Sequence, residues 1–395
     1  QVGGSVDGAR GSLENLARFM RNNPGAEGFL NRLGVQTRDA SGNMRDMATI
    51  FTGVGQRLSS MPYYRANQYA QMLGIDENTL IGGVPEYVLL TFGLAFAIIT
   101  PCIVVGGFAE RMKFSAVMLF SILWLIIVYA PVNHIVWGGS GALFHNWGVL
   151  DFAGGTAIHI NAGIAALVGA FVLGRRKGWP TTPMPPHNVI FTLMGMAFLW
   201  LGWFGFNVGS ALAINESAIV AFITTMFATC TGILGWLVIE KIKSGHVTAL
   251  GLASGAIAGL VGITPACAFV GPLSALFIGF VSAIGCYYAI TVLKKKLGVD
   301  DALDVFALHG IGGIIGCILT GVFCVPALGG KVEGIEIIPQ VTAQIASIIV
   351  TIIYSGLVTW IIMKVVDKMI GLRASPEAEQ KGLDISDHNE RAYNN

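Results

Sequence analysis

The chain has 395 residues, of which 54% are apolar and only 12% are charged. Soluble globular domains carry about 25% charged residues, so this composition excludes a soluble enzyme, a nucleic-acid binder and a disulfide-stapled secreted domain, and predicts a membrane protein. The net charge of +1 points to no acidic or basic partner.

Residues 1–82 differ in amino-acid composition from the rest of the chain. Residues 1–80 hold eight Arg and no Lys, whereas the remaining residues hold five Arg and eleven Lys. This segment has no apolar run near the roughly 20 residues that span a bilayer. Short helical patterns at 13–19 and 66–73 are separated by the breaker Asn23-Pro24-Gly25. We expect a soluble-looking helical N-terminal segment that is a loose appendage, unrelated to the apolar remainder of the chain.

From residue 86 onward, apolar runs predict nine transmembrane helices, each long enough for a hydrocarbon core of about 30 Å. They must be helices, because lipid offers no partner to backbone N–H and C=O groups. The sequence therefore predicts an all-α membrane protein. The expected spans are 86–108, 114–134, 154–174, 188–212, 217–239, 247–264, 269–292, 303–325 and 338–366.

The loops between these spans predict the orientation of the chain. Loops on one side hold ten basic residues, and those on the other side hold only Lys331. Because positively charged loops stay in the cytoplasm, the lysine-rich side and the C-terminus are expected to be cytoplasmic. The predicted location is the cell membrane, with the chain crossing it many times.

Two spans carry a histidine in the same setting. His159 is followed four and five residues later by Gly163-Ile164, and His309 by Gly313-Ile314. The two spans lie five apart in the alternating count, so they cross the membrane in opposite directions, as in an inverted-topology repeat. The second half uses five spans to reach its histidine and the first half only three. We therefore expect two helices to be missing or replaced ahead of residue 86.

Several motifs resemble the ammonium transporter family, the Amt/Mep/Rh group, over residues 83–395. The segment from Asp151 to Gly163 is the most specific of them. The resemblance implies an inverted-repeat ammonium transporter fold, with residues 83–371 as helices 3 to 11 of the family and 372–395 as a cytoplasmic regulatory tail. Further matching segments are 108–111, 134–139, 202–210, 300–310, 371–373, 382–384 and 392–393.

The resemblance also implies an outer site that recruits NH4+. Its π-faces and acceptor oxygen would come from Trp137, Phe96 and Ser210, since a cation over an aromatic face gains about 0.5–2 kcal/mol. Below it the family places a gate of phenyl rings, which corresponds here to Phe92, Phe96 and Phe206. Phe92 and Phe96 lie one helical turn apart and so share a face.

His159 and His309 are the strongest candidates for a function, because ionisable groups at membrane depth are costly and usually functional. An imidazole pair can pass a proton along a path that a hydrated cation cannot follow. The resemblance implies that NH4+ is deprotonated near the gate, after which NH3 and H+ cross separately. Asp151 is expected to cap its span and to favour cations, and Asp304 to cap the span of His309.

The expected partners are ammonium or ammonia, lipid, two further copies in a homotrimer and a PII-type signal protein at the cytoplasmic face. The last two follow from the resemblance. No cofactor or metal is expected, and no nucleophile–base set indicates an enzyme. Two alternatives stay open: an ammonium sensor of the same fold, and an inactive chimera or fragment that lacks two helices.

Overall fold

The computed structural model describes residues 6–60, 80–81, 84–391 and 393. By its internal contacts the chain divides into two units, residues 1–92 and 93–395, and each is described by itself. The helical pattern expected at 66–73 lies outside the described residues.

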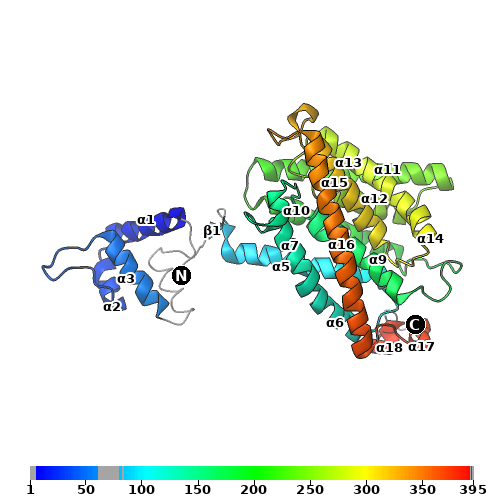
Figure 1. Ribbon diagram of the computed structural model, residues 1–395, viewed down its shortest axis with the longest axis horizontal. Helices are drawn as coiled ribbons and strands as arrows, with labels where there is room; N and C mark the ends of the chain where they lie inside the picture. Colours follow the sequence, from blue (N-terminus) through cyan, green and yellow to red (C-terminus); the bar gives the residue numbers. More distant parts are fainter. Residues whose placement is uncertain (1–5, 61–79, 82–83, 392, 394–395) are drawn as a thin grey trace. The chain divides into compact units, whose positions relative to one another are not determined.

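Within residues 6–60, the first unit forms three helices with a small core of their own (Figure 1). They are α1 (Val6–Asn22), α2 (Ala26–Leu33) and α3 (Met47–Ser59). Asp46 starts α3 by accepting a hydrogen bond from the Thr49 N–H at 2.9 Å, as an N-cap does. Six side chains are buried together in this part: Leu16, Leu30, Leu33, Val35, Ile50 and Val54.

Residues 6–60 contain no helix long and apolar enough to cross a membrane. Two short strands, β1 (Leu80–Ile81) and β2 (Val84–Pro85), pair antiparallel ahead of α5 (Glu86–Val105). Helix α5 begins in the first unit and continues into the second.

Among the described residues, eight helices are long and apolar enough to span a membrane, not nine. The helical stretches after α5 include α6 (Phe114–Trp124), which continues through η2 (Leu125–Tyr129) into α7 (Ala130–Trp137) as one span. The others are η3 (Gly155–Ile160) with α9 (Asn161–Leu173), α10 (Val189–Asn207), α11 (Glu216–Ser244), α13 (Pro272–Tyr288) with η5 (Ala289–Leu293) and α14 (Lys294–Leu297), η6 (Phe306–Ile311) with α15 (Gly312–Phe323), and α16 (Ile337–Ile370).

The ninth expected span is α12 (Ala249–Ile263), which has only 15 residues. A helix in contact with lipid needs about 20 residues to satisfy its backbone across the bilayer. Helix α12 ends early because protein surrounds it: the chain just after it is buried, and the Pro265 carbonyl accepts a hydrogen bond from the Phe152 N–H at 3.1 Å.

The two halves of the second unit are tied together by matching backbone contacts. The Phe152 N–H bonds to Pro265 beyond α12, and the Ala302 N–H bonds to Gly107 beyond α5, also at 3.1 Å. Phe152 and Ala302 each directly follow an Asp that precedes a histidine helix. Helices α5 and α12 are therefore structural counterparts, as the inverted repeat predicts.

The span 114–137 shows that the two histidine helices start at opposite ends of this unit. At one end, Arg111 donates to the Asp300 carbonyl, and at the other the Trp137 indole donates to the Asp151 carbonyl at 2.8 Å. The span has 24 residues, so these ends are separated by about 36 Å at 1.5 Å per residue.

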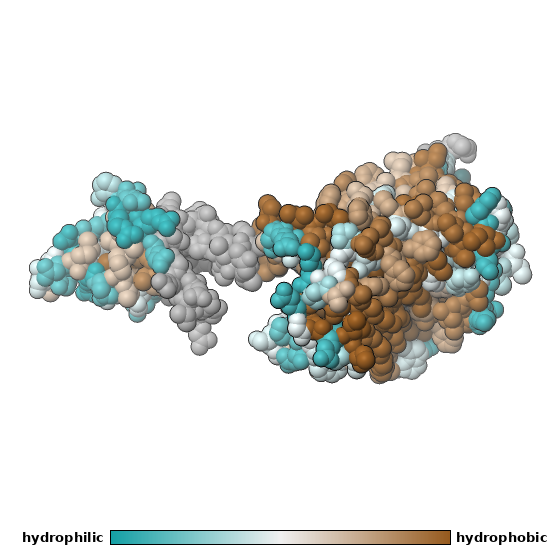
Figure 2. Space-filling model, turned by 90° about the horizontal axis from the view of Figure 1, so that it is seen from above, coloured by the Kyte–Doolittle hydropathy of each residue, from teal (hydrophilic) through white to brown (hydrophobic). Residues whose placement is uncertain are grey.

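Helix α16 is the longest, with 34 residues, and packs against α6, α9 and α15 (Figure 1). After it, α17 (Pro376–Lys381) and α18 (Leu383–His388) fold back on the end that carries Arg111. The Lys113 N–H donates to the Leu372 carbonyl at 2.9 Å there. The visible face of this unit in Figure 2 is mostly apolar, as expected for a surface in lipid.

Candidate functional site

Each histidine lies in a stretch of π-helix at the start of its membrane helix. His159 is in η3 and His309 in η6, and both stretches continue into regular helices. Short π-helical segments occur frequently at functional sites because they widen the turn and redirect side chains. The similar local geometry extends the sequence repeat, so the two imidazoles are presented in equivalent ways.

Glycines let the two histidine helices approach at their backbones. A Cβ on Gly163 would lie 2.5 Å from the Cα of Gly310, and one on Gly313 would lie 3.1 Å from the Gly155 carbonyl oxygen. Gly163 and Gly313 are the glycines found four residues after each histidine in the sequence repeat. Their lack of a side chain allows the contact and so brings His159 and His309 together.

The imidazole rings face each other through their Nδ1 atoms, which lie 3.1 Å apart. Such a contact needs one Nδ1–H donor and one bare Nδ1 acceptor, so the two neutral rings adopt opposite tautomers. One Nε2 then carries a proton and the other does not. The Nε2 of His159 is buried and has no hydrogen-bond partner among the described residues.

Aromatic rings lead from one end of the unit to this pair. Trp137 meets Phe96 edge-to-face at 6.0 Å between centroids, and Phe96 meets Phe206 at 4.5 Å. The Phe206 ring stacks on His159 at 5.7 Å with an interplanar angle of 14°. Helices α5, α7, α10 and η3 therefore contribute one continuous series of rings that ends at the imidazoles.

Two further expected site residues lie close in sequence to members of this series. The Ser210 hydroxyl donates to the Phe206 carbonyl at 2.7 Å, which leaves lone pairs on its oxygen to accept from another donor. Phe92 is half-buried on α5, one turn before Phe96. The structure brings Phe96, Phe206 and the histidines into ring contact and places Ser210 beside them.

Asp151 caps the His159 helix through both carboxylate oxygens. Oδ1 accepts from the N–H groups of Gly154 and Gly155 at 2.8 and 2.7 Å. Oδ2 accepts from the Thr156 N–H at 2.7 Å and from the Thr156 hydroxyl. The sequence suggested this cap, and the hydrogen bonds agree with it.

The expectation that Asp304 caps the His309 helix is wrong. Its Oδ1 instead pairs with Lys294 Nζ at 2.7 Å. The cap is Asp301, whose Oδ2 accepts from the Phe306 N–H at 2.8 Å. The spacing could have identified it, because Asp151 and Asp301 each lie eight residues before their histidine and Asp304 lies only five before.

Two functional neighbours were missed from the sequence. Trp203 stacks on His159 at 5.4 Å and donates its indole N–H to Thr264 at 2.9 Å, so it fixes one wall of the pair. Its place three residues before Phe206, on the same helix face, was the available signal. Arg111 is fully buried, and burial lowers its guanidinium pKa to about 10.

Arg111 belongs to a polar network at the end of the unit near the tail. It donates to backbone carbonyls of residues 107, 109, 174 and 300. Nearby, Arg176 pairs with Asp300 at 2.9 Å and with Glu110 at 2.6 Å. Burial opposes ionisation of Asp300, but the hydrogen bonds from Arg176 outweigh it and lower the Asp300 pKa.

The tail residues reach into this network. Arg373 donates to the carbonyls of Leu173 and Arg175 at 2.9 and 2.7 Å, and Glu379 accepts from the Lys177 N–H at 3.0 Å. A cavity of about 730 Å³ lies between the tail and the loop after α9, with Glu110, Arg176 and Asp384 among its lining residues. The tail is therefore packed against the ends of the membrane helices.

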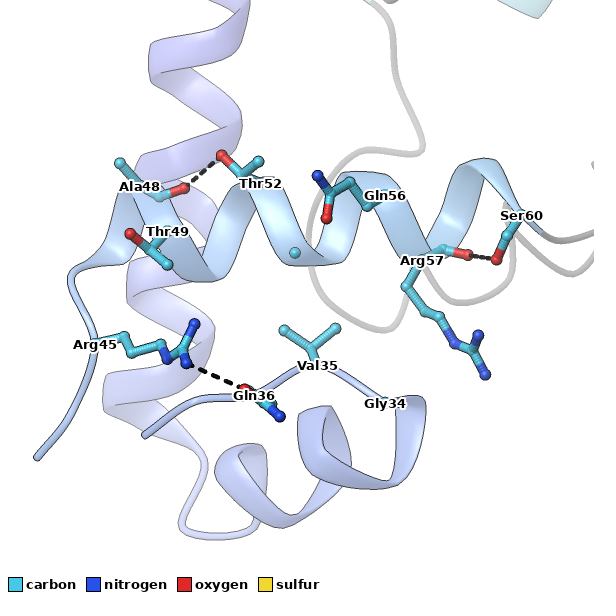
Figure 3. Close-up of a pocket in the computed structure, with 11 residues that line it drawn as sticks. Gly34, Val35, Gln36, Arg45, Ala48, Thr49, Thr52, Gln56, Arg57 and Ser60 are labelled. Atoms are coloured by element: carbon cyan, nitrogen blue, oxygen red, sulfur yellow. Dashed lines mark hydrogen bonds between the residues drawn. The ribbon is translucent and has the colours of Figure 1, made fainter. Parts of the chain in front are cut away.

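The described residues show no group of three or more His, Cys, Asp or Glu side chains arranged to hold a metal ion. The first unit has a cavity of about 780 Å³, drawn in Figure 3. Its two guanidinium groups are already engaged: Arg45 donates to Gln36 at 3.1 Å, and Arg57 donates to the Leu33 carbonyl at 2.9 Å. We assign no ligand to it.

Apolar helices arranged as an inverted repeat around paired histidines define a multi-pass membrane protein of the transporter class. The model of the Ammonium Transporter Family matches residues 40–393, beginning earlier than residue 83, where the motifs begin. An ammonium transporter of Aquifex aeolicus is 49% identical over 322 residues, which is 81% of this chain and 74% of that protein. One of Bacillus subtilis is 45% identical over 326 residues, with 81% and 79% covered. The chain belongs to the ammonium transporter family.

Solved structures agree with this fold. The crystal structure of Saccharomyces cerevisiae Mep2 matches with a TM-score of 0.68 at 36% identity, covering 75% of this chain and 68% of that one. A Sensor Amt Protein matches with a TM-score of 0.73 and covers 96% of this chain and 98% of that one. Its identity is 24%, so this second likeness concerns the fold alone.

Proposed function

We propose that this chain transports ammonium across the cell membrane. The observation that carries the proposal is the ring series from Trp137 to His159, which ends at an Nδ1–Nδ1 contact of 3.1 Å with His309. A series of aromatic faces attracts a cation and strips its water, and a histidine pair then moves a proton. The relatives named ammonium transporters support the same substrate.

Recruitment begins at Trp137, Phe96 and the oxygen of Ser210. NH4+ donates an N–H to that oxygen while the indole and phenyl faces stabilise its charge. The indole N–H is held by the Asp151 carbonyl at 2.8 Å, so the Trp137 ring keeps its orientation. Potassium has a similar size but has no N–H to donate. The hydroxyl oxygen therefore favours ammonium more through the directional hydrogen bond that it accepts than through attraction to the positive charge.

The gate consists of Phe92, Phe96 and Phe206, and it separates the recruited ion from the histidines. A charged ion does not cross closely packed rings, since an unpaired charge is costly in an apolar environment. Ammonium therefore gives up its proton before this point. Neutral NH3 passes the rings, and the proton crosses through water and the imidazole pair. The net movement carries one positive charge for each NH3.

The proposed orientation rests on the charges of the loops, and the proposed assembly rests on the resemblance to the family. The end with Arg111 and the tail faces the cytoplasm, because the basic loops gather there. Three copies form a homotrimer, and the exposed face of α10 supports a close helix contact, since Gly195 and Gly202 face open space. A PII-type signal protein binds the cytoplasmic end beside the tail. Residues 1–82 form a separate polar unit, and 83–371 the membrane domain.

The test of this function is an ammonium-evoked current from the purified chain in liposomes, compared with a potassium gradient. His159→Ala should abolish the current or remove its preference over potassium, because the proton path is interrupted while the outer site remains. His246→Ala is the matched control, since His246 is exposed in the loop before α12. A current and selectivity in His159→Ala equal to those of the parent chain would refute the proposal.

A further inference from the structure

The two aspartates that cap the histidine helices are held very differently. Asp151 receives hydrogen bonds on both carboxylate oxygens, from the N–H groups of Gly154, Gly155 and Thr156. Asp301 receives one at its Oδ2, from the Phe306 N–H at 2.8 Å. Its Oδ1 has no hydrogen-bond partner among the described residues, although the side chain is only 2% exposed. Counterparts in the repeat therefore differ in what stabilises their charge.

The negative charge of Asp304 also disfavours the ionised form of Asp301, while the positive charge of Lys294 favours it. Lys294 places its Nζ on the Asp301 backbone carbonyl at 2.6 Å and on the Asp304 carboxylate at 2.7 Å, not on the Asp301 carboxylate. Arg111 directs its hydrogen bonds to backbone carbonyls. Burial, and then the negative charge of Asp304, raise the pKa of Asp301 to about 7.

We propose that Asp301 is a proton-holding residue at the cytoplasmic start of the His309 helix, where its Oδ1 takes up and releases the proton that crosses apart from NH3. This inference rests on the proposed function. It assigns to Asp301 a task that its counterpart Asp151, saturated with donors, does not perform.

The step is a simple proton transfer. A protonated water that reaches the buried Oδ1 gives its proton to it, one O–H bond breaks and one forms, and the carboxyl becomes neutral. Oδ2 continues to accept from Phe306, so the helix start is kept in both states. The proton then passes to cytoplasmic water. Because the Asp301 pKa is near neutrality, both directions of transfer are accessible at cytoplasmic pH.

The first test is an infrared titration of the whole chain in liposomes, which does not require transport. We expect the carbonyl band of a protonated carboxylic acid below about pH 7 and its loss as the pH rises through that value. Asp301→Asn should remove this titrating band. Glu110→Gln, which changes an exposed carboxyl at the same end, should keep it. Asp304→Asn should shift it to lower pH, because a neighbouring negative charge is gone and Lys294 is freed.

The second test is the dependence of the ammonium-evoked current on the pH of the cytoplasmic side. The parent chain should show a step near the infrared midpoint, and Asp301→Asn should lose that step. A purely structural cap would leave the pH profile unchanged, since Asn also caps helices well. The inference is overturned if the titrating band is absent, if it survives in Asp301→Asn, or if that variant keeps the parent's pH step. A parent chain without current refutes the proposed function, while the infrared result still decides whether Asp301 holds the proton.

Discussion

Helices α5 and α12 are counterparts in the inverted repeat, yet one is largely uncovered and the other is enclosed. In α12, 11 of 15 residues are buried. In α5, Val88, Leu90, Leu94 and Ile98 are each more than half exposed. The enclosed helix has α10 and α11 ahead of it in the sequence and in contact with it. Among the described residues ahead of α5, no helix has membrane length.

This difference shows that hydropathy does not decide which intramembrane helix is covered by protein. Both sequences are apolar, and lipid can replace protein against either one. Whether a helix is covered depends on the presence of a neighbouring helix. Glycines indicate where that neighbour lies, because they occur where its backbone comes close. A Cβ on Gly259 of α12 would meet the backbone carbonyl of Ala228 on α11, whereas one on Gly93 of α5 would meet nothing within 4 Å.

The largest effect is expected from Gly259→Leu. The new side chain must displace the backbone of α11, and overpacking of this kind costs about 3 kcal/mol or more. Thermal unfolding in detergent should show a clear loss of stability. Gly93→Leu is the matched variant and should stay within about 0.5 kcal/mol of the parent chain. Equal losses in the two variants would mean that α5 has a close partner after all.

Replacing Asp151 and Asp301 in turn by asparagine compares how much each cap contributes to stability in the two halves of the repeat. Asp151→Asn loses the charge and one of two fully used oxygens, and hydrogen bonds to a charged group contribute about 1.5–3 kcal/mol. Asp301→Asn keeps an oxygen for the Phe306 N–H and should cost less than about 1 kcal/mol at neutral pH. Chemical unfolding of both variants checks the order, and a reversed order would contradict the difference in their caps.

The pH dependence of stability sharpens that comparison. The pKa of Asp301 is raised from 3.8 to about 7 on folding, so its stabilising contribution is complete below pH 3.8 and is lost as the pH rises through about 7. The parent chain should therefore lose thermal stability between about pH 4 and pH 7 more steeply than Asp301→Asn. Parallel curves for the two chains would show that Asp301 is ionised throughout.

The smallest effect compares two indole N–H groups on α10. Trp203 donates to Thr264 at 2.9 Å, whereas the Trp200 N–H has no partner among the described residues. Trp203→Phe should cost about 1 kcal/mol more than Trp200→Phe, because only the first breaks a hydrogen bond. Melting temperatures of the two variants measure the difference. A Trp200→Phe variant that is the less stable of the two would indicate a partner on its face of α10.

Much of the fold could be predicted from periodicity alone. The expected span 114–134 and the observed 114–137 share their start, and the paired histidines lie in the helices that the repeat indicated. The length of α12 could not be predicted, because it depends on the protein that surrounds its C-terminal end. Leu16 and Leu30 likewise show no sign in the sequence that they share a core, since their contact depends on the turn at Pro24.

At the site, the sequence did not indicate which of several neighbouring aspartates caps the His309 helix. Asp300, Asp301 and Asp304 precede His309, and composition does not tell which one faces a helix start. Asp304 has a positive φ of 58° and pairs with Lys294, while Asp301 turns its carboxylate to Phe306. Aligning the two Asp-to-His spacings would have separated them. The roles of Trp137, Ser210 and the phenyl rings remain predictions until currents are measured.

Because of the Nδ1–Nδ1 contact, the histidine pair can pass one proton in a given direction and must then return to its starting tautomers. On the proposed proton path, in the state where the Nε2 of His159 is bare, a proton that arrives there pushes the shared proton across to His309 and releases the one on the far Nε2. Afterwards both rings have exchanged tautomers, and His159 offers a donor where the next proton needs an acceptor. Neither ring can turn over without breaking the contact. If the proposed path holds, each proton passage is therefore followed by a separate return step, and that step sets an upper limit on how fast charge can follow NH3.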